Sequence, residues 1–272
     1  MRINHNISSM ITQGALYGVS REQSKTLEKL STGLRINRAS DDAAGLGVSE
    51  NLRKEVRGIG MAKRNAQDGI SLLNIAEGSM NEVSDILQRM RELAVQSAND
   101  TLTSTERGYT DSEFQALSSE IDRIVNTTRY NTQTLINGDW GGSILHVGAN
   151  SSGDDEISVT INSMLAADIG VSGDLLDQTT AVAALTAMDT AIGSVNAERS
   201  NVGTLVNRLE HTVNNLINQE HNNQAAESAV RDTDFAVETA NFTKYQILTQ
   251  SATAMLAQAN LVPQSVLGLL GR

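Results

Sequence analysis

The residues most able to do chemistry are too scattered in this sequence to form a recognisable catalytic or metal site. The four histidines are His5, His146, His211 and His221, and none lies four residues from another or in an HExxH pattern, the spacing with which a helix binds zinc. Cysteine is absent, which excludes disulfides, thiolate nucleophiles and cysteine-ligated metals. We therefore expect no metal, no cofactor and no enzymatic activity.

The adjacent acids Asp41 and Asp42 resemble a carboxylate pair, but they precede a stretch with helical periodicity. Ser40 or Asp41 is expected to cap a helix that begins near Ala43, where acidic side chains also interact favourably with the helix dipole. The glycines that follow lack the G-x-x-x-x-G-K-[ST] spacing of a phosphate loop. We interpret them as small residues at close helix contacts or flexible joints.

Composition narrows the class of protein further. The 272 residues include 21 Lys and Arg against 32 Asp and Glu, a net charge of -11, which argues against a nucleic-acid binder. One proline and eight aromatic residues permit long helices packed through aliphatic side chains. No apolar stretch approaches the roughly 20 residues of a membrane span, and the first 30 residues show no apolar core of a cleavable secretory signal. We expect no membrane insertion.

Apolar residues in the second half recur at alternating spacings of three and four, the repeat of a coiled-coil or bundle seam. One such seam runs from Leu185 to Leu216, and a second runs from Tyr245 to Leu269. Pro263 lies inside the second seam, and we expect the helix to bend or end there.

The first half shows the same pattern. One seam runs from Leu52 to Leu73, and another, shifted around the helix, runs from Leu72 to Leu93. This shift predicts one long helix that touches two neighbours, and a shorter helix is expected over Phe114–Ile124.

The middle of the chain differs from the two ends in charge and in hydrophobic pattern. No Lys or Arg occurs between Arg129 and Arg199, where nine acidic residues lie. Turn signals in Asn137–Ile161 surround short alternating strands, which predicts a small hairpin or two, and a polar loop is expected from there to about Thr180. The predicted fold is therefore mainly α, a long antiparallel helical coiled coil or bundle with a small β-hairpin element in the middle.

The two ends pose a physical problem. Residues 1–36 and 240–272 each form one amphipathic helix, and two such helices share only one narrow seam, which is marginal in water. Residues 245–272 carry one Arg and no Lys, so a membrane-surface helix is disfavoured. We infer that the ends become ordered by burial against other copies, and a repeated heterologous contact of this kind gives an open helical filament.

Three blocks of the sequence resemble bacterial flagellin. They are LSTGLRINRASDDAAG from Leu30, the long stretch from Asn65 to Asp100, and NFTKYQILTQSATAMLAQANLVPQSVLGLL from Asn241. The resemblance covers about residues 1–137 and 185–270. It implies a secreted, extracellular subunit of the flagellar filament, here a minimal form with almost no variable outer domain.

The resemblance also implies a domain plan and a set of partners. Residues 1–36 and 237–272 would form the inner coiled-coil core domain, 37–46 a linker, and 47–236 an outer helical rod domain with its small β element at 137–184. The implied partners are other copies of the chain, the flagellar type III export apparatus, an export chaperone, and the filament cap and hook-junction proteins. A host Toll-like receptor that senses flagellin is a further implied partner.

Three groups of site residues follow. The expected subunit contacts of the terminal helices are Ile3, Ile7, Met10, Leu27, Leu30, Leu34, Tyr245, Leu248, Met255, Val262, Val266 and Leu269. The positions that match the receptor-recognition patch of the rod are Leu87, Gln88, Arg89, Leu93 and Glu113. Ser151 and Ser152 are expected O-glycan sites in an exposed loop.

Two alternatives remain open from the sequence. The first is a hook–filament junction protein, which is flagellin-like but present in few copies. The second is an enzyme or glycan-binding module within residues 137–184, a segment that lacks a credible set of paired acids and has Trp140 as its one tryptophan.

Overall fold

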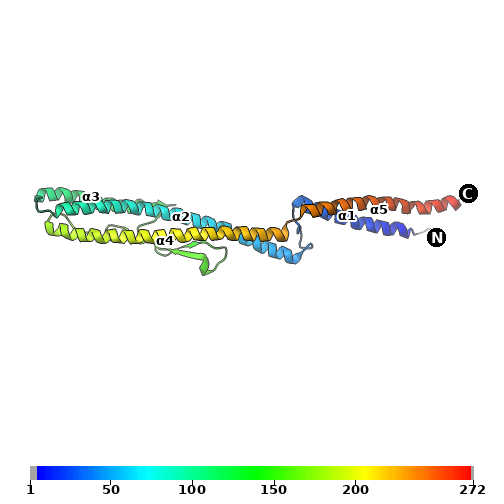
Figure 1. Cartoon of the computed structure of the whole chain (residues 1–272), viewed down its shortest axis with the longest axis horizontal. Helices are drawn as coiled ribbons and strands as arrows, with labels where there is room; N and C mark the ends of the chain where they lie inside the picture. The colour runs from blue at the N-terminus through cyan, green and yellow to red at the C-terminus, as the bar shows by residue number, and fades with distance from the viewer. Residues whose placement is uncertain (1–4, 271–272) are drawn as a thin grey trace. The chain divides into compact units, whose positions relative to one another are not determined.

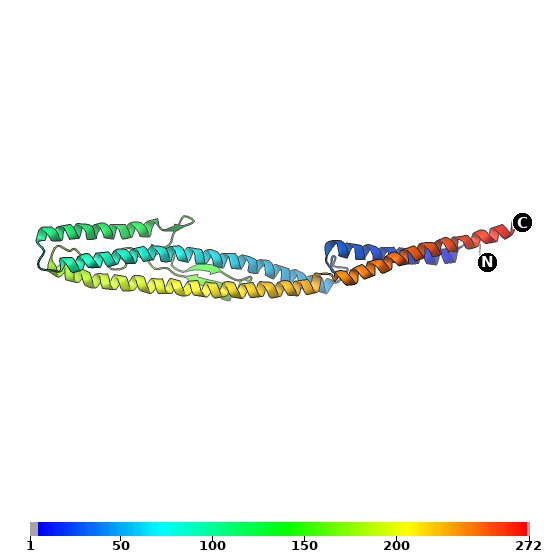
Figure 2. The ribbon, with the colours of Figure 1, turned by 45° about the horizontal axis from the view of Figure 1, so that its top comes forward.

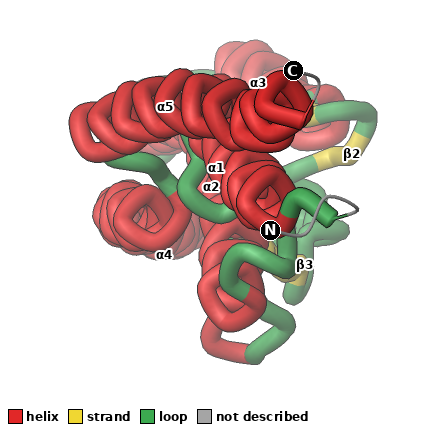
Figure 3. Tube along the Cα trace, turned by 90° about the vertical axis from the view of Figure 1, so that its right-hand side faces the viewer, coloured by secondary structure: helices red, strands yellow, loops and turns green. Residues whose placement is uncertain are grey.

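A computed structural model describes residues 5–270, with side chains described as far as Leu261. Five helices and two small antiparallel hairpins make up the regular structure, and Figure 3 shows how helices dominate the described chain. This confirms the predicted fold class. In chain order the elements are α1 (Ile7–Thr32), α2 (Ala43–Ser97), α3 (Ser104–Thr127), β1 (Arg129–Tyr130), β2 (Gln133–Thr134), β3 (Ser143–His146), the 3-10 turn η1 (Gly153–Asp155), β4 (Glu156–Val159), α4 (Gln178–Arg231) and α5 (Phe235–Leu270).

The chain divides into two compact units. The first combines Met1–Lys54 with Asn222–Arg272, and the second is Glu55–His221. Both divisions fall inside continuous helices, because α2 and α4 each run through the boundary. The domain plan expected from the sequence places its boundaries elsewhere, at residues 37–46 and between 236 and 237, and it stays a prediction.

In the first unit, α1 and α5 pack side by side as an antiparallel pair (Figure 1). Asn6 caps α1 by accepting a hydrogen bond from the backbone N–H of Ser9 at 3.1 Å, and its Nδ2 donates to the carbonyl of Ala259 at 2.9 Å. The helix ends at Gly33, whose φ of 73° is the left-handed conformation that glycine adopts freely. Helix α5 continues through Pro263 to Leu270, so of the predicted bend or end at this proline, the end does not occur.

The start of α2 corrects a second prediction. Asp42 is the capping residue, because its Oδ1 accepts a hydrogen bond from the backbone N–H of Gly45 at 2.8 Å. Asp41 instead accepts from the backbone N–H of Arg38 at 3.0 Å, within the preceding turn, and this bond lowers the pKa of Asp41. The expected cap at Ser40 or Asp41 is wrong by one or two residues.

In the second unit, α3 and α4 both run beside α2 (Figures 1 and 2). The buried positions of α2 keep the spacing of three and four along most of the helix. Those of α4 do so from Ala181 to Val202 and then recur every seventh residue to Leu216, as a bundle seam requires. The core side chains of α2 include Ile59, Ala62, Ala66, Leu73, Ala76, Met80, Val83, Leu87, Met90, Leu93 and Ala94; those of α4 include Met188, Val195, Val202, Leu209 and Leu216. Helix α3 adds Phe114, Ile121 and Val125.

The hairpin of β3 and β4 lies within Asn137–Ile161, where turn signals predicted one, whereas the hairpin of β1 and β2 precedes that segment and was not predicted. Strands β3 and β4 pair antiparallel with His146 opposite Glu156. Ile157 of β4 and Val147, which follows β3, are buried. Strands β1 and β2 are joined by Asn131 and Thr132, both with positive φ, which is the backbone of a tight hairpin turn.

The segment between β4 and α4 has no helix or strand, as expected of the predicted loop, but it is not the solvent-exposed polar loop that the sequence indicated. The segment contributes core side chains, since Ile161 and Leu175 are fully buried. Carboxylates of the helices hold its backbone: Glu198, itself 3% exposed, accepts hydrogen bonds from the backbone N–H of Asn162 at 3.3 Å and its Nδ2 at 2.7 Å. Asp111 accepts in the same way from the backbone N–H of Leu175 at 2.9 Å.

Candidate interaction surfaces

The pair formed by α1 and α5 carries large apolar side chains that face solvent. Met10 is 65% exposed and Met255 is 60% exposed, although an isolated folded chain gains by burying such side chains. Other exposed apolar residues of the pair are Ile7, Ile11, Tyr17, Leu27, Phe235, Val237, Ile247, Leu248 and Leu261. An apolar surface of this extent is typical of a contact with another protein.

The structure places the predicted terminal-helix residues as follows. Ile7, Met10, Leu27, Leu248 and Met255 are exposed on the pair, whereas Leu30, Leu34 and Tyr245 are half-buried. Ile3 lies outside the described residues, as do the side chains of Val262, Val266 and Leu269. Ile11, Tyr17 and Ile247 belong to the same exposed set and were not singled out from the sequence.

A second surface lies on α2 and α3 of the second unit. The guanidinium of Arg89 donates to Oε1 of Glu113 from Nε at 3.1 Å and from Nη2 at 2.9 Å, and to Glu92 from Nη1 at 3.1 Å. The hydrogen bond with Glu113 raises the pKa of Arg89. Gln88 is exposed beside this cluster, so α2 and α3 present a polar, well-defined charged surface.

The two leucines of the predicted receptor patch occupy a different environment. Leu87 is fully buried and Leu93 is 2% exposed, both within the core of the second unit. Their side chains therefore pack in the core beneath this surface. The residues of the patch that a partner can contact are Gln88, Arg89 and Glu113.

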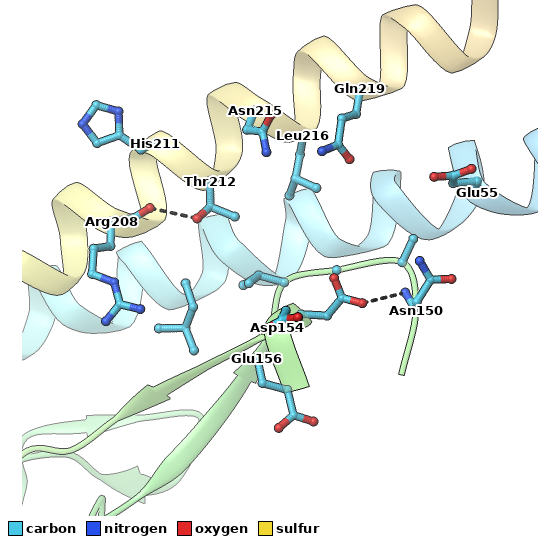
Figure 4. Close-up of a pocket in the computed structure, with 15 residues that line it drawn as sticks. Glu55, Asn150, Asp154, Glu156, Arg208, His211, Thr212, Asn215, Leu216 and Gln219 are labelled. Atoms are coloured by element: carbon cyan, nitrogen blue, oxygen red, sulfur yellow. Dashed lines mark hydrogen bonds between the residues drawn. The ribbon is translucent and has the colours of Figure 1, made fainter. Parts of the chain in front are cut away.

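A polar groove of about 420 Å³ lies between α4 and the loop that joins β3 to β4 (Figure 4). Arg208 and Leu216 extend from α4 toward the loop, whereas Glu156 points away from the groove. The other side chains that line it include Glu55, Asp154, Thr212, Asn215 and Gln219. His211 is among the lining residues, but no Phe, Tyr or Trp is, and no cluster of potential metal ligands occurs in the described part of the chain.

Two glycines allow this loop to approach its neighbours. A Cβ on Gly58 of α2 would lie 2.8 Å from the Cβ of Ala149, and a Cβ on Gly148 would overlap the carboxylate of Asp155. Asp155 in turn accepts a hydrogen bond from the backbone N–H of Asn150 at 3.2 Å. The predicted glycan sites Ser151 and Ser152 are exposed in the same loop.

Comparison with known proteins decides the family. The family model described as the bacterial flagellin N-terminal helical region matches residues 3–140, and the one described as the bacterial flagellin C-terminal helical region matches residues 185–270. The chain belongs to the bacterial flagellin family. It is therefore a structural subunit of the extracellular flagellar filament that serves motility, and it is not an enzyme.

Individual relatives agree over the whole length. This flagellin is 48% identical to the flagellin of Halalkalibacterium halodurans, over 99% of this chain and 100% of that one. It is 42% identical to the flagellin of Bacillus subtilis (strain 168), with the same coverage of both chains. Among solved structures, the crystal structure of Bacillus cereus flagellin matches with a TM-score of 0.51 and 32% identity, over 56% of this chain and 88% of that one.

These matches confirm the resemblance inferred from the three sequence blocks, including the absence of a large variable domain. They favour the filament subunit over a hook–filament junction protein and over an enzyme in the middle segment. None of the described helices is long and apolar enough to cross a membrane.

Proposed function

We propose that the exposed apolar side chains of α1 and α5 are the contact through which this flagellin polymerises, and that the terminal helices become fully ordered only in that contact. The observation that carries the proposal is the exposure of Met10 and Met255, together with the other apolar residues of the pair. Ordering the backbone costs about 1–2 kcal/mol per residue, and a helix pair with one shared seam recovers little of this. Neighbouring copies would supply the missing apolar burial.

Hydrogen exchange tests this coupling. In dilute monomer we expect amides of residues 7–32 and 235–261 to exchange much faster than those of residues 59–94, whose side chains form the core of the second unit. In filaments the terminal amides should become as protected as the core. Terminal helices that are already protected in dilute monomer would contradict the proposal.

Membership of the flagellin family supports interactions with the other partners that the sequence resemblance implied. We infer that the flagellar type III export apparatus, an export chaperone, the filament cap and the hook-junction proteins handle this chain. We also infer the domain plan given above, with residues 1–36 and 237–272 in the inner core, 37–46 as linker and 47–236 in the outer rod. Exposure of Ser151 and Ser152 supports O-glycosylation of that loop, which mass spectrometry of native filaments would detect.

A second function is supported by the geometry of the Arg89 cluster. A flagellin-sensing Toll-like receptor would contact Gln88, Arg89 and Glu113, because these side chains are exposed and fixed by mutual hydrogen bonds. Replacing Arg89 and Glu113 together by alanine should reduce receptor activation by monomer at least tenfold in a reporter assay. Full activity of this double variant, with an unchanged thermal melt, would exclude the patch as the receptor contact.

A further inference from the structure

A hollow of about 310 Å³ lies on the second unit. It is lined by residues of α2, of the hairpin formed by β1 and β2, and of β3, together with Trp140. Small-molecule sites in proteins occupy about 300–1,000 Å³, so this hollow has room for one small ring-shaped ligand. It is called the Trp140 hollow below.

The wall that β3 contributes is held close to α2. Asn65 of α2 donates from Nδ2 to the backbone carbonyl of His146 at 3.0 Å. A Cβ on Gly69 would lie 2.6 Å from Cδ1 of Leu145, so glycine at this position of α2 permits the close approach of β3. Leu72, which also lines the hollow, is 4% exposed and belongs to the core. The hollow therefore rests on packed structure and is formed without a ligand.

Two aromatic rings line the hollow in a chain that has only eight aromatic residues. Tyr130 and Trp140 are half-buried and pack against the core. Among the described residues, neither the Tyr130 hydroxyl nor Nε1 of Trp140 has a hydrogen-bond partner, and neither atom is buried without one. Both polar atoms are therefore open to solvent, although rings of this kind commonly bind a partner through them. Ile144, which is 60% exposed, adds an apolar side chain beside the rings.

The remaining polar groups of the hollow are also without partners. Asp68, Asn131 and Gln133 are exposed, and in the described chain their side chains form no hydrogen bond or ion pair. Asn131 is held in the tight turn between β1 and β2 by its φ of 46°. Among the described residues that line the hollow there is no Lys or Arg, so an anionic ligand would meet Asp68 without a compensating charge.

We propose that the Trp140 hollow binds one neutral sugar unit in its pyranose form. A pyranose has a face of C–H groups, which packs favourably on the electron-rich face of an aromatic ring. Its edge carries hydroxyls that both donate and accept hydrogen bonds. The amides of Asn131 and Gln133 match such hydroxyls because each amide offers donors and an acceptor, and the Asp68 carboxylate accepts from others. This binding activity is additional to polymerisation.

Two other classes of small ligand match the hollow less well. An organic cation would use the two rings and Asp68 through cation–π and ionic attraction, but it would leave both amides without a role. A nucleotide would stack on the rings, but its phosphate would be repelled by Asp68. A neutral sugar is the ligand that engages the rings, the amides and the carboxylate together.

The site depends on segments that lie far apart in the sequence. Residues 137–184, considered above as an isolated glycan-binding module, supply Trp140 and β3. Tyr130, Gln133 and Asp68 come from outside that segment. We therefore expect sugar binding by the full-length chain, and the test uses the full-length monomer.

Tryptophan fluorescence measures binding directly, because Trp140 is the one tryptophan of the chain. Titration of the monomer with methyl β-glucopyranoside, methyl β-galactopyranoside and methyl α-mannopyranoside should give a saturable change for at least one sugar. The expected dissociation constant is roughly 1–10 mM, as is usual for so small a ligand in an open site. Sorbitol, an open-chain polyol without a pyranose face, should give no saturable change, and neither should methyl β-glucuronide, which is an anion.

Substitutions of exposed residues assign the response to the hollow. Gln133→Ala and Asp68→Ala should each weaken binding of the best sugar at least about threefold, because each removes a hydrogen-bonding group. Gln67→Ala is the matched control, since Gln67 is exposed on α2 and does not line the hollow. Trp140→Ala should abolish saturation transfer from the protein to the sugar in NMR. Thermal melts of the variants at Gln133, Asp68 and Gln67 should agree with the parent.

Four results would overturn the proposal. They are the absence of a saturable response to all three sugars at roughly tenfold the expected dissociation constant, an equal response to sorbitol, tighter binding of tetramethylammonium than of any sugar, and unchanged affinity in both Gln133→Ala and Asp68→Ala. All measurements use dilute monomer, so they do not depend on the assembly contact of α1 and α5. Failure of sugar binding would leave that contact untouched, and failure of that contact would leave sugar binding untouched.

Discussion

Glutamate at both Met10 and Met255 is expected to abolish filament formation while leaving a folded, soluble monomer. Both side chains are exposed in the described chain, at 65% and 60%, so the substitutions remove no core packing. In a filament they would place two carboxylates in an apolar contact without partners. Burial of each Met contributes roughly 1.5–3 kcal/mol, and an unpaired buried charge costs several kcal/mol more.

The combined loss exceeds about 4 kcal/mol per subunit, which corresponds to roughly a thousandfold rise in critical concentration. Sedimentation after seeded polymerisation and electron microscopy of the pellet measure this effect. Gln13→Glu with Gln250→Glu is the matched control, because it adds the same charge to the same two helices at exposed polar positions. Filaments from the Met10, Met255 variant at the parent concentration would exclude this surface as the assembly contact.

The long helices could be predicted from the sequence because their burial is periodic. The seam through Leu185–Leu216 places Met188, Val195 and Val202 inward, and all three are buried. A spacing of three and four along a chain with one proline has few other structural solutions. The same periodicity identified α2 as a helix with more than one neighbour.

The 160–177 segment could not be predicted in this way. Its buried residues, such as Ile161, Met164 and Ile169, follow neither a helical nor a strand period, so the stretch reads as polar loop. What fixes the segment is the set of hydrogen bonds that Asn162 and Leu175 donate to the carboxylates of Glu198 and Asp111. These acceptors lie at least 36 residues away in the sequence from the backbone they bind. Contacts of that kind leave no local pattern.

The burial of the residues in the predicted receptor patch also could not be predicted from the sequence. The sequence places Leu87, Arg89 and Leu93 within two turns of one helix, and resemblance to the family grouped them as one surface. The side chains of Leu87 and Leu93 point into the core, whereas Arg89 faces outward and meets Glu113 of α3. Which face of α2 each residue occupies depends on where α3 and α4 pack, and this could not be read from the motif.

Leu87→Ala is accordingly expected to act through stability and not through recognition. Leu87 is fully buried in the core of the second unit, and removing such a side chain leaves a cavity that costs about 2–5 kcal/mol. Denaturant unfolding followed by circular dichroism should show this loss as a lower midpoint with an unchanged slope. Gln88→Ala, at the adjacent exposed position, should leave the midpoint within error of the parent.

A receptor-signalling assay distinguishes residues that contact the receptor, such as Arg89, from residues that stabilise the fold, such as Leu87. At a temperature where Leu87→Ala remains folded, its Arg89 and Glu113 still form the exposed cluster, so the folded monomer should activate the receptor as the parent does. The Arg89, Glu113 double variant should show the opposite behaviour, with signalling lost and the unfolding midpoint little changed, because exposed ion pairs contribute little to stability. If Leu87→Ala lost signalling while fully folded, Leu87 would have to contact the receptor. Its side chain would then not be buried in the core when the receptor binds.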